Sequence, residues 1–193
     1  TITENSSGGN DTLDFGGITV AMIFTIGKDS VSITDGSSTF AYTGTNIETF
    51  AGGSNNDIFR FLDGAKISGS LDGQGGYDTL DLAAYTSACQ VTLSNTGTVD
   101  GFKGTTSLLG TNGFNNINKI IGSTAEGVSD TLTGCNAPAV FYLAEGRYQS
   151  GNTLDYSGFE NLKGGSDADN FVFADGTDFA GSILGGAGKD TLD

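Results

Sequence analysis

Apolar residues alternate with polar ones in short runs along this chain, and glycine-rich turns separate the runs. Phe59 and Phe61 share one side of such a run, and Leu80 and Leu82 share one side of another. This two-residue period predicts short β-strands with one buried face. The 32 glycines argue against helices, because each interior glycine costs a helix about 1 kcal/mol relative to alanine. We therefore expect an all-β fold.

The strand pattern also recurs as an internal repeat. Residues 47–81 align without a gap on residues 159–193, with 17 of 35 positions identical. Weaker copies of the same phrase lie at 6–14, 117–134 and 151–157. The recurrence predicts a single repeat array over 1–193. Within it, segment 94–150 is irregular and too rich in Gly, Thr and Asn for its strands to be placed.

A shorter period lies inside each of the two clear copies. Asp57 is followed 21 residues later by Asp78, and Phe171 is followed 21 residues later by Leu192. Strands that return after about 20 residues predict a right-handed parallel β-solenoid, in which successive coils stack their inward side chains. We expect Phe59 to lie beside Leu80 in the next coil, and Phe171 beside Leu192.

The turns of these coils carry a resemblance to a known family. The segment "GGAGKDTLD" (185–193) matches the nonapeptide G-G-x-G-x-D-x-U-x, where U is a large apolar residue. The chain therefore resembles the RTX (repeats-in-toxin, haemolysin-type) family, whose repeat binds calcium. The segment "GQGGYDTLD" (73–81) lacks only the second glycine. In "GGSNNDIFR" and "GGSDADNFV" the fourth glycine is replaced by Asn55 and Asp167, residue types that tolerate a left-handed backbone better than most.

The resemblance implies calcium ions held between neighbouring coils. The side-chain ligands that it implies are Asp57, Asp78, Asp169 and Asp190. The backbone carbonyl ligands that it implies belong to Gly52, Ser54, Gly73, Gly75, Gly164, Ser166, Gly185 and Ala187. Because the motifs occur as two pairs rather than in tandem, two sites on one edge are expected. The alternative is that the aspartates only close turns, since an Asx-turn needs no metal.

Composition narrows the classes of molecule that the chain is expected to bind directly. The net charge is −15, with 18 Asp and 5 Glu, so nucleic acid and anionic membranes would be repelled. No apolar run approaches the roughly 20 residues of a membrane span, so no membrane insertion is expected. The chain contains no histidine, which removes the Ser-His-Asp triad and histidine-bearing zinc sites.

Two smaller expectations concern individual side chains. Cys89 and Cys135 are the two cysteines, and the sequence leaves open whether they are bridged or are two small buried residues. The last aspartate of the "DTLD" phrases (Asp14, Asp81 and Asp193) is expected to face solvent beside a core-facing leucine.

These features favour a non-catalytic, extracellular structural module, secreted or at the cell surface, such as part of an adhesin, a surface layer or a fibre. Calcium is its expected ligand, because extracellular modules bind this ion at the concentrations of the medium. Self-association end to end, or continuation in a longer array, is expected, and a carbohydrate or cell-surface ligand is possible. The alternatives are a carbohydrate-binding or polysaccharide-modifying β-helix module, or the RTX-type secretion and folding tail of a toxin, protease or lipase.

Overall fold

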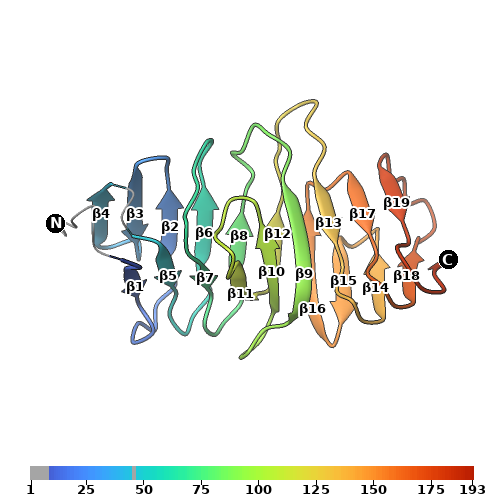
Figure 1. Ribbon diagram of the computed structural model, residues 1–193, viewed down its shortest axis with the longest axis horizontal. Helices are drawn as coiled ribbons and strands as arrows, with labels where there is room; N and C mark the ends of the chain where they lie inside the picture. Colours follow the sequence, from blue (N-terminus) through green and yellow to red (C-terminus); the bar gives the residue numbers. More distant parts are fainter. Residues whose placement is uncertain (1–8, 45–46) are drawn as a thin grey trace.

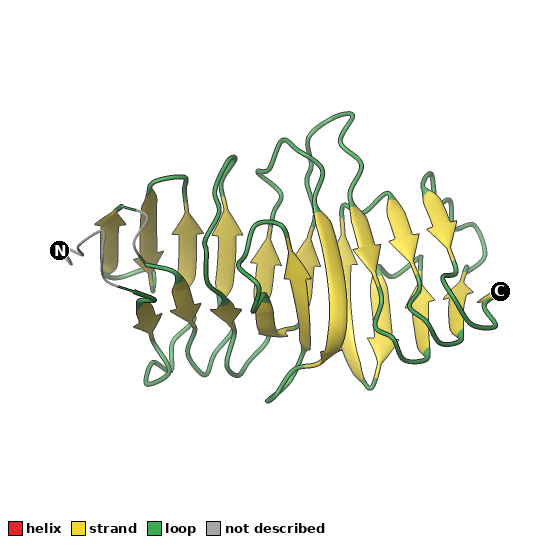
Figure 2. Ribbon diagram, viewed as in Figure 1, coloured by secondary structure: helices red, strands yellow, loops and turns green. Residues whose placement is uncertain are grey.

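A computed structural model describes residues 9–44 and 47–193, which form an all-β fold with no helix in those ranges (Figure 2). Its strands lie side by side along the long axis of the molecule (Figure 1). The expectation of an all-β fold is confirmed. The same ranges contain no helix with the length and apolarity needed to cross a membrane. Residues 6–8, the start of one weak copy, lie outside the described part of the chain.

The strands form two sheets, here called sheet A and sheet B, in which neighbours are hydrogen-bonded. The nine strands of sheet A are, in spatial order, β1 (Thr12–Asp14), β5 (Thr49–Ala51), β7 (Leu71–Asp72), β11 (Phe114–Ile117), β10 (Phe102–Thr106), β9 (Gln90–Thr96), β13 (Thr131–Thr133), β17 (Asn161–Lys163) and β19 (Ser182–Leu184). The eleven strands of sheet B are β20 (Thr191–Leu192), β18 (Asp169–Val172), β14 (Ala139–Tyr142), β15 (Arg147–Ser150), β16 (Asn152–Ser157), β12 (Lys119–Ile121), β8 (Thr79–Asp81), β6 (Ile58–Phe61), β2 (Ile23–Ile26), β3 (Ser30–Thr34) and β4 (Thr39–Thr43).

Most neighbouring strands are parallel, and the chain passes from one sheet to the other along much of its length. For example, β5 and β7 pair in sheet A, whereas β6 and β8, which follow them along the chain, pair in sheet B. We call each successive strand position in a sheet a rung. The pairing places Phe59 opposite Leu80 and Phe171 opposite Leu192. The predicted 21-residue register is confirmed in both copies.

Antiparallel excursions interrupt this parallel order. After β8 the chain enters sheet A at β9, beside the later strand β13, and then runs back through β10 and β11 to pair with β7. In sheet B, β14 pairs with β18, and β15 and β16 return to pair with β12. Each of these two excursions adds two strands to its own sheet, whereas β3 and β4, each antiparallel to its neighbour, extend sheet B alone. The predicted irregular segment 94–150 contains most of both excursions.

The core lies between the sheets and is rich in phenylalanine. Phe24 and Phe59 stack on neighbouring rungs with ring centroids 4.6 Å apart, and Phe141 and Phe171 stack at 4.7 Å. All four side chains are at most 2% exposed. Burial of each such side chain is worth about 1.5–3 kcal/mol. Repetition of one apolar position on successive rungs therefore supplies much of the driving force that holds the rungs together.

Candidate functional site

The motif aspartates lie where the chain enters a strand, and their side chains link one rung to the next. The backbone N–H of Met22 donates to Oδ1 of Asp57 at 2.7 Å, and the N–H of Asp57 donates to Oδ1 of Asp78 at 2.8 Å. The N–H of Asp78 donates in turn to Oδ1 of Asn118 at 2.9 Å. Each acceptor thus satisfies a backbone donor of the preceding rung that no strand pairing satisfies.

The same arrangement occurs at other strand starts. In sheet A, the backbone N–H of Asp11 donates to Oε2 of Glu48 at 2.8 Å, and that of Cys89 donates to Oδ1 of Asp130 at 2.7 Å. The backbone N–H of Asp130 donates in turn to Oε2 of Glu160 at 2.8 Å. In sheet B, the backbone N–H of Asp169 donates to Oδ1 of Asp190 at 3.0 Å. We call the accepting residues the acceptor ladder: Glu48, Asp57, Asp78, Asn118, Asp130, Glu160 and Asp190. Four of these seven lie outside the predicted ligand set. Their shared signal is a carboxylate or amide residue directly before a strand.

Two motif aspartates also close their own turn. Gly53 N–H donates to Oδ2 of Asp57 at 2.6 Å, and Gly165 N–H donates to Oδ2 of Asp169 at 2.7 Å. Both oxygens of Asp57 therefore accept a backbone N–H. The donor lies four residues before the aspartate in each case, so this is not the Asx-turn expected from sequence, in which the donor follows the side chain by two residues. At Asp57 these bonds account for both carboxylate oxygens without a metal ion.

The other two motif turns have a different backbone. In turn 73–78, Gln74 has φ +71° and Gly76 has φ +129°; in turn 185–190, Gly186 has φ +96° and Gly188 has φ +118°. A φ well beyond +100° is open to glycine and strained for other residues, so glycine at the fourth position permits this conformation. We call turns of this kind open turns. Those that end at Asp57 and Asp169 are called capped turns.

The fourth motif position accounts for the difference between the two kinds of turn. Asn55 and Asp167 occupy it in the capped turns, and neither is among the non-glycine residues with positive φ in the described part of the chain. Their tolerance of a left-handed backbone is therefore not used, contrary to the reason given for them from sequence. The structure shows that loss of the fourth glycine accompanies a change of turn conformation.

In the open turn 73–78 the N–H of the second residue does not donate to the motif aspartate. Gln74 N–H donates to Oδ1 of Asp72 at 2.9 Å. The Oδ2 atom of Asp78 is buried, and among the described residues it has no hydrogen-bond partner. Oδ1 of Asp169 is in the same state, although its Oδ2 atom is capped. A buried carboxylate oxygen without a donor is costly unless the group is protonated or bound to a cation.

Burial dominates the electrostatics of these aspartates. Asp57 and Asp78 have no exposed surface, and Asp169 is 2% exposed. Burial raises the pKa of all three carboxyls above the usual value. For Asp78 the pKa rises to about 8, because burial is reinforced by the negative charges of Asp57, Asp100 and Asp72, and the N–H of Asp57 opposes it only in part. Asp78 is thus the motif aspartate whose burial is least offset by hydrogen-bond donors.

The structure brings the predicted side-chain ligands together in pairs. Asp57 lies against Asp78, and Asp169 lies against Asp190, on rungs of sheet B that adjoin one another. Within residues 9–44 and 47–193 no three Asp, Glu or Cys side chains form a group able to hold a metal ion. A cation at these turns would therefore need backbone carbonyls as well, as the motif implies.

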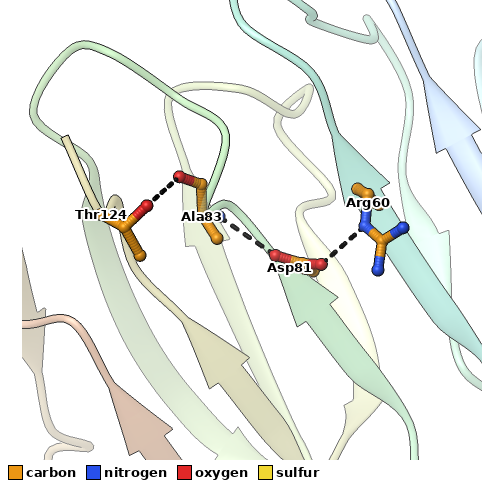
Figure 3. Close-up of polar contacts among 4 residues, drawn as sticks. All are labelled: Arg60, Asp81, Ala83 and Thr124. Atoms are coloured by element: carbon orange, nitrogen blue, oxygen red, sulfur yellow. Dashed lines mark hydrogen bonds and ion pairs between the residues drawn. The ribbon is translucent and has the colours of Figure 1, made fainter.

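Asp81 is the one "DTLD" aspartate that does not face solvent. Its side chain accepts a hydrogen bond from Nε of Arg60 at 2.8 Å and one from the N–H of Ala83 at 3.1 Å (Figure 3). Thr124 Oγ1 donates to the carbonyl of Ala83 at 3.0 Å, which extends the contact to the segment after β12. The expectation of a solvent-facing Asp81 was wrong, because the parallel register places Arg60 directly beside it. Asp14 and Asp193 are exposed as expected.

Cys89 and Cys135 are both buried and unbridged. Burial raises the pKa of the Cys89 thiol to about 12, and the nearby charge of Asp130 adds to the shift. The second of the two readings that the sequence left open therefore holds: they are small buried residues.

Comparison with known proteins adds no relative. No protein-family model matches the chain, and neither curated proteins nor solved structures yield a match. The RTX resemblance therefore remains a prediction that rests on the motifs quoted above.

Proposed function

We propose that this chain is a non-catalytic structural module: a right-handed parallel β-solenoid, stiffened by calcium, within a secreted or cell-surface protein. The observation that carries the proposal is the acceptor ladder, which ties several neighbouring rungs together at their strand starts. Such side-chain hydrogen bonds stabilise the stack, and they give the accepting carboxylates and amide a structural role. The parallel 21-residue register supports the solenoid.

Calcium fits some of these turns better than others. At Asp57 both carboxylate oxygens already accept a backbone N–H, so neither oxygen is left without a donor for an ion to bind. At Asp78 and Asp169 one buried oxygen has no donor, which suits a hard cation that prefers oxygen ligands. The carbonyls of Gly73 and Gly75 belong to the first of these turns, and those of Gly164 and Ser166 to the second. When bound, the ion would supply positive charge to offset buried carboxylates in a chain of charge −15.

Addition of further rungs, from a longer array or from a second copy, is part of the same proposal. The first and last strands of sheet A, β1 and β19, run in one direction, because two antiparallel steps lie between them. In sheet B, β4 and β20 also run in one direction. A following array could therefore join both sheets by parallel pairing.

The test is the thermal stability of the purified protein with calcium and with excess chelator, together with metal analysis. A ligand that binds only the native state stabilises it by mass action, so chelation should lower the melting temperature, and calcium should restore it. Light scattering in calcium would report end-to-end growth. An unchanged melting temperature in chelator and absence of bound calcium would leave the metal-free turn as the explanation of the aspartates.

A further inference from the structure

The open turn 73–78 meets a second carboxylate that the motif does not contain. Asp100 lies on the turn between β9 and β10, and its Oδ2 atom accepts the N–H of Gly76 at 3.2 Å. Gly76 is the fourth residue of the open turn. The antiparallel excursion therefore brings Asp100 onto the same turn that leaves Oδ2 of Asp78 without a donor.

Asn118 connects the two carboxylates. Its Oδ1 atom accepts the N–H of Asp78 at 2.9 Å, and its Nδ2 group donates to Oδ1 of Asp100 at 3.4 Å. Each carboxylate therefore keeps an oxygen that no strong donor saturates: Oδ2 of Asp78 has no partner, and Oδ1 of Asp100 has one long contact. Two carboxyl groups thus lie beside one turn in a buried and half-buried setting, where a cation would interact with them more strongly than in water.

We propose that Asp78 and Asp100 together form the tightest calcium site of this chain, on the open turn 73–78, and that the capped turns, where a backbone amide already occupies an oxygen of Asp57 and of Asp169, bind the ion more weakly. This inference rests on calcium binding as proposed above and adds which turn binds it and why. The reason is local. The open turn 73–78 directs its second N–H onto Asp72, whereas the capped turns direct theirs onto the motif aspartate.

Terbium(III), which takes oxygen ligands as calcium does, offers a readout specific to this turn. Tyr77 precedes Asp78 and is 41% exposed, so light absorbed by its ring can sensitise terbium bound beside it. The wild-type chain should give saturable luminescence that calcium displaces. Tyr77→Phe should lose most of that luminescence, while calcium still raises its melting temperature.

A matched pair of variants then assigns the site. Asp78→Asn and Asp169→Asn both replace a buried oxygen that has no donor, so each keeps its remaining backbone acceptor and should fold. Asp78→Asn should abolish the luminescence, and Asp100→Asn should weaken terbium and calcium binding at least tenfold. For Asp169→Asn and the exposed turn variant Asp35→Asn, the affinity for terbium and calcium should stay within about twofold of wild type.

The outcomes separate the two proposals. If chelation lowers the melting temperature but Asp100→Asn binds as Asp35→Asn does, calcium stabilises the protein at another turn, and the assignment to Asp78 and Asp100 is overturned. If Asp169→Asn removes the binding and Asp78→Asn does not, the ranking of open over capped turns is overturned. If neither calcium nor terbium binds at millimolar concentration, both proposals fail, and Asp78 holds a proton instead.

Discussion

The ring of Phe102 on β10 packs edge-on against the ring of Tyr148 on β15, with centroids 5.4 Å apart and an interplanar angle of 63°. Each residue lies on a middle strand of an antiparallel excursion, one in sheet A and one in sheet B. Both side chains are fully buried. The contact thus joins the two excursions across the core and keeps the sheets matched where the parallel order is interrupted.

Removal of this contact should destabilise the whole stack. Phe102→Ala is expected to lower the free energy of unfolding by about 3–5 kcal/mol, as measured by denaturant unfolding. The single variant Tyr148→Phe keeps the ring and removes the hydroxyl that accepts the N–H of Cys135 at 2.8 Å, which should cost about 1–3 kcal/mol. Val99→Ala is the control, because Val99 is 67% exposed. A loss no larger than that of the control would place Phe102 outside the core.

The metal-free protein should become less stable as the pH rises from about 4 to about 8. Burial raises the pKa of Asp57, Asp78, Asp130 and Asp169, so the folded chain holds protons that the unfolded chain releases. Their stabilising contribution is complete below the ordinary pKa of 3.8 and is lost as the pH passes the folded-state value, which is about 8 for Asp78. The measurement is chemical unfolding in chelator across this range.

Asp78→Asn should remove much of that pH dependence, on the order of a few kcal/mol at pH 8. The amide keeps an oxygen for the N–H of Asp57 and removes the buried charge. Asp35→Asn serves as the control, because its exposed carboxyl accepts N–H bonds from Ser37 and Ser38 that lower its pKa. A free energy of unfolding that instead increased from pH 4 to pH 8 would contradict this prediction. It would show that the buried carboxyls are ionised and stabilised by their hydrogen-bond donors.

The first motif glycine is required by the close approach of neighbouring rungs. A Cβ atom at Gly164 would overlap the carbonyl oxygen of Gly185 and the carboxylate of Asp169. Gly164→Ala should therefore cost about 1–3 kcal/mol. Gly17→Ala should change stability by less than about 0.5 kcal/mol, because nothing lies within 4 Å of a Cβ built there. Equal melting temperatures for the two variants would contradict this packing.

The two thiols should be inert in the folded protein. Cys89 and Cys135 are buried and unbridged, and burial raises the pKa of both thiols. A reductant should leave the melting temperature unchanged, and a thiol reagent should react with both cysteines only after unfolding. Rapid labelling of the native protein, or a melting temperature lowered by reductant, would contradict the buried free state.

Local pattern determined the parts of the fold that repeat. The alternation around Phe59 and the 21-residue return to Leu80 predicted both the strands and their pairing, because the side-chain period of a strand and the coil length are properties of the chain itself. The all-β class followed from the same pattern. The hairpin of β3 and β4 also had a local signal, the Asp35–Gly36 turn between alternating runs, where Gly36 has φ +87°.

Tertiary structure decided which strands meet when the repeat is interrupted. Nothing within β9 specifies that it pairs with β13 rather than β7, because that choice depends on the space that β10 and β11 fill. The position of Asp100 beside the open turn follows from this excursion. The burial of Asp81 beneath Arg60 follows from register between strands. The sequence by itself therefore determined the repeating unit, whereas contacts between residues far apart in the chain decided which of its carboxylates lie beside a partner from outside the motif, as Asp78 lies near Asp100 and Asp81 near Arg60.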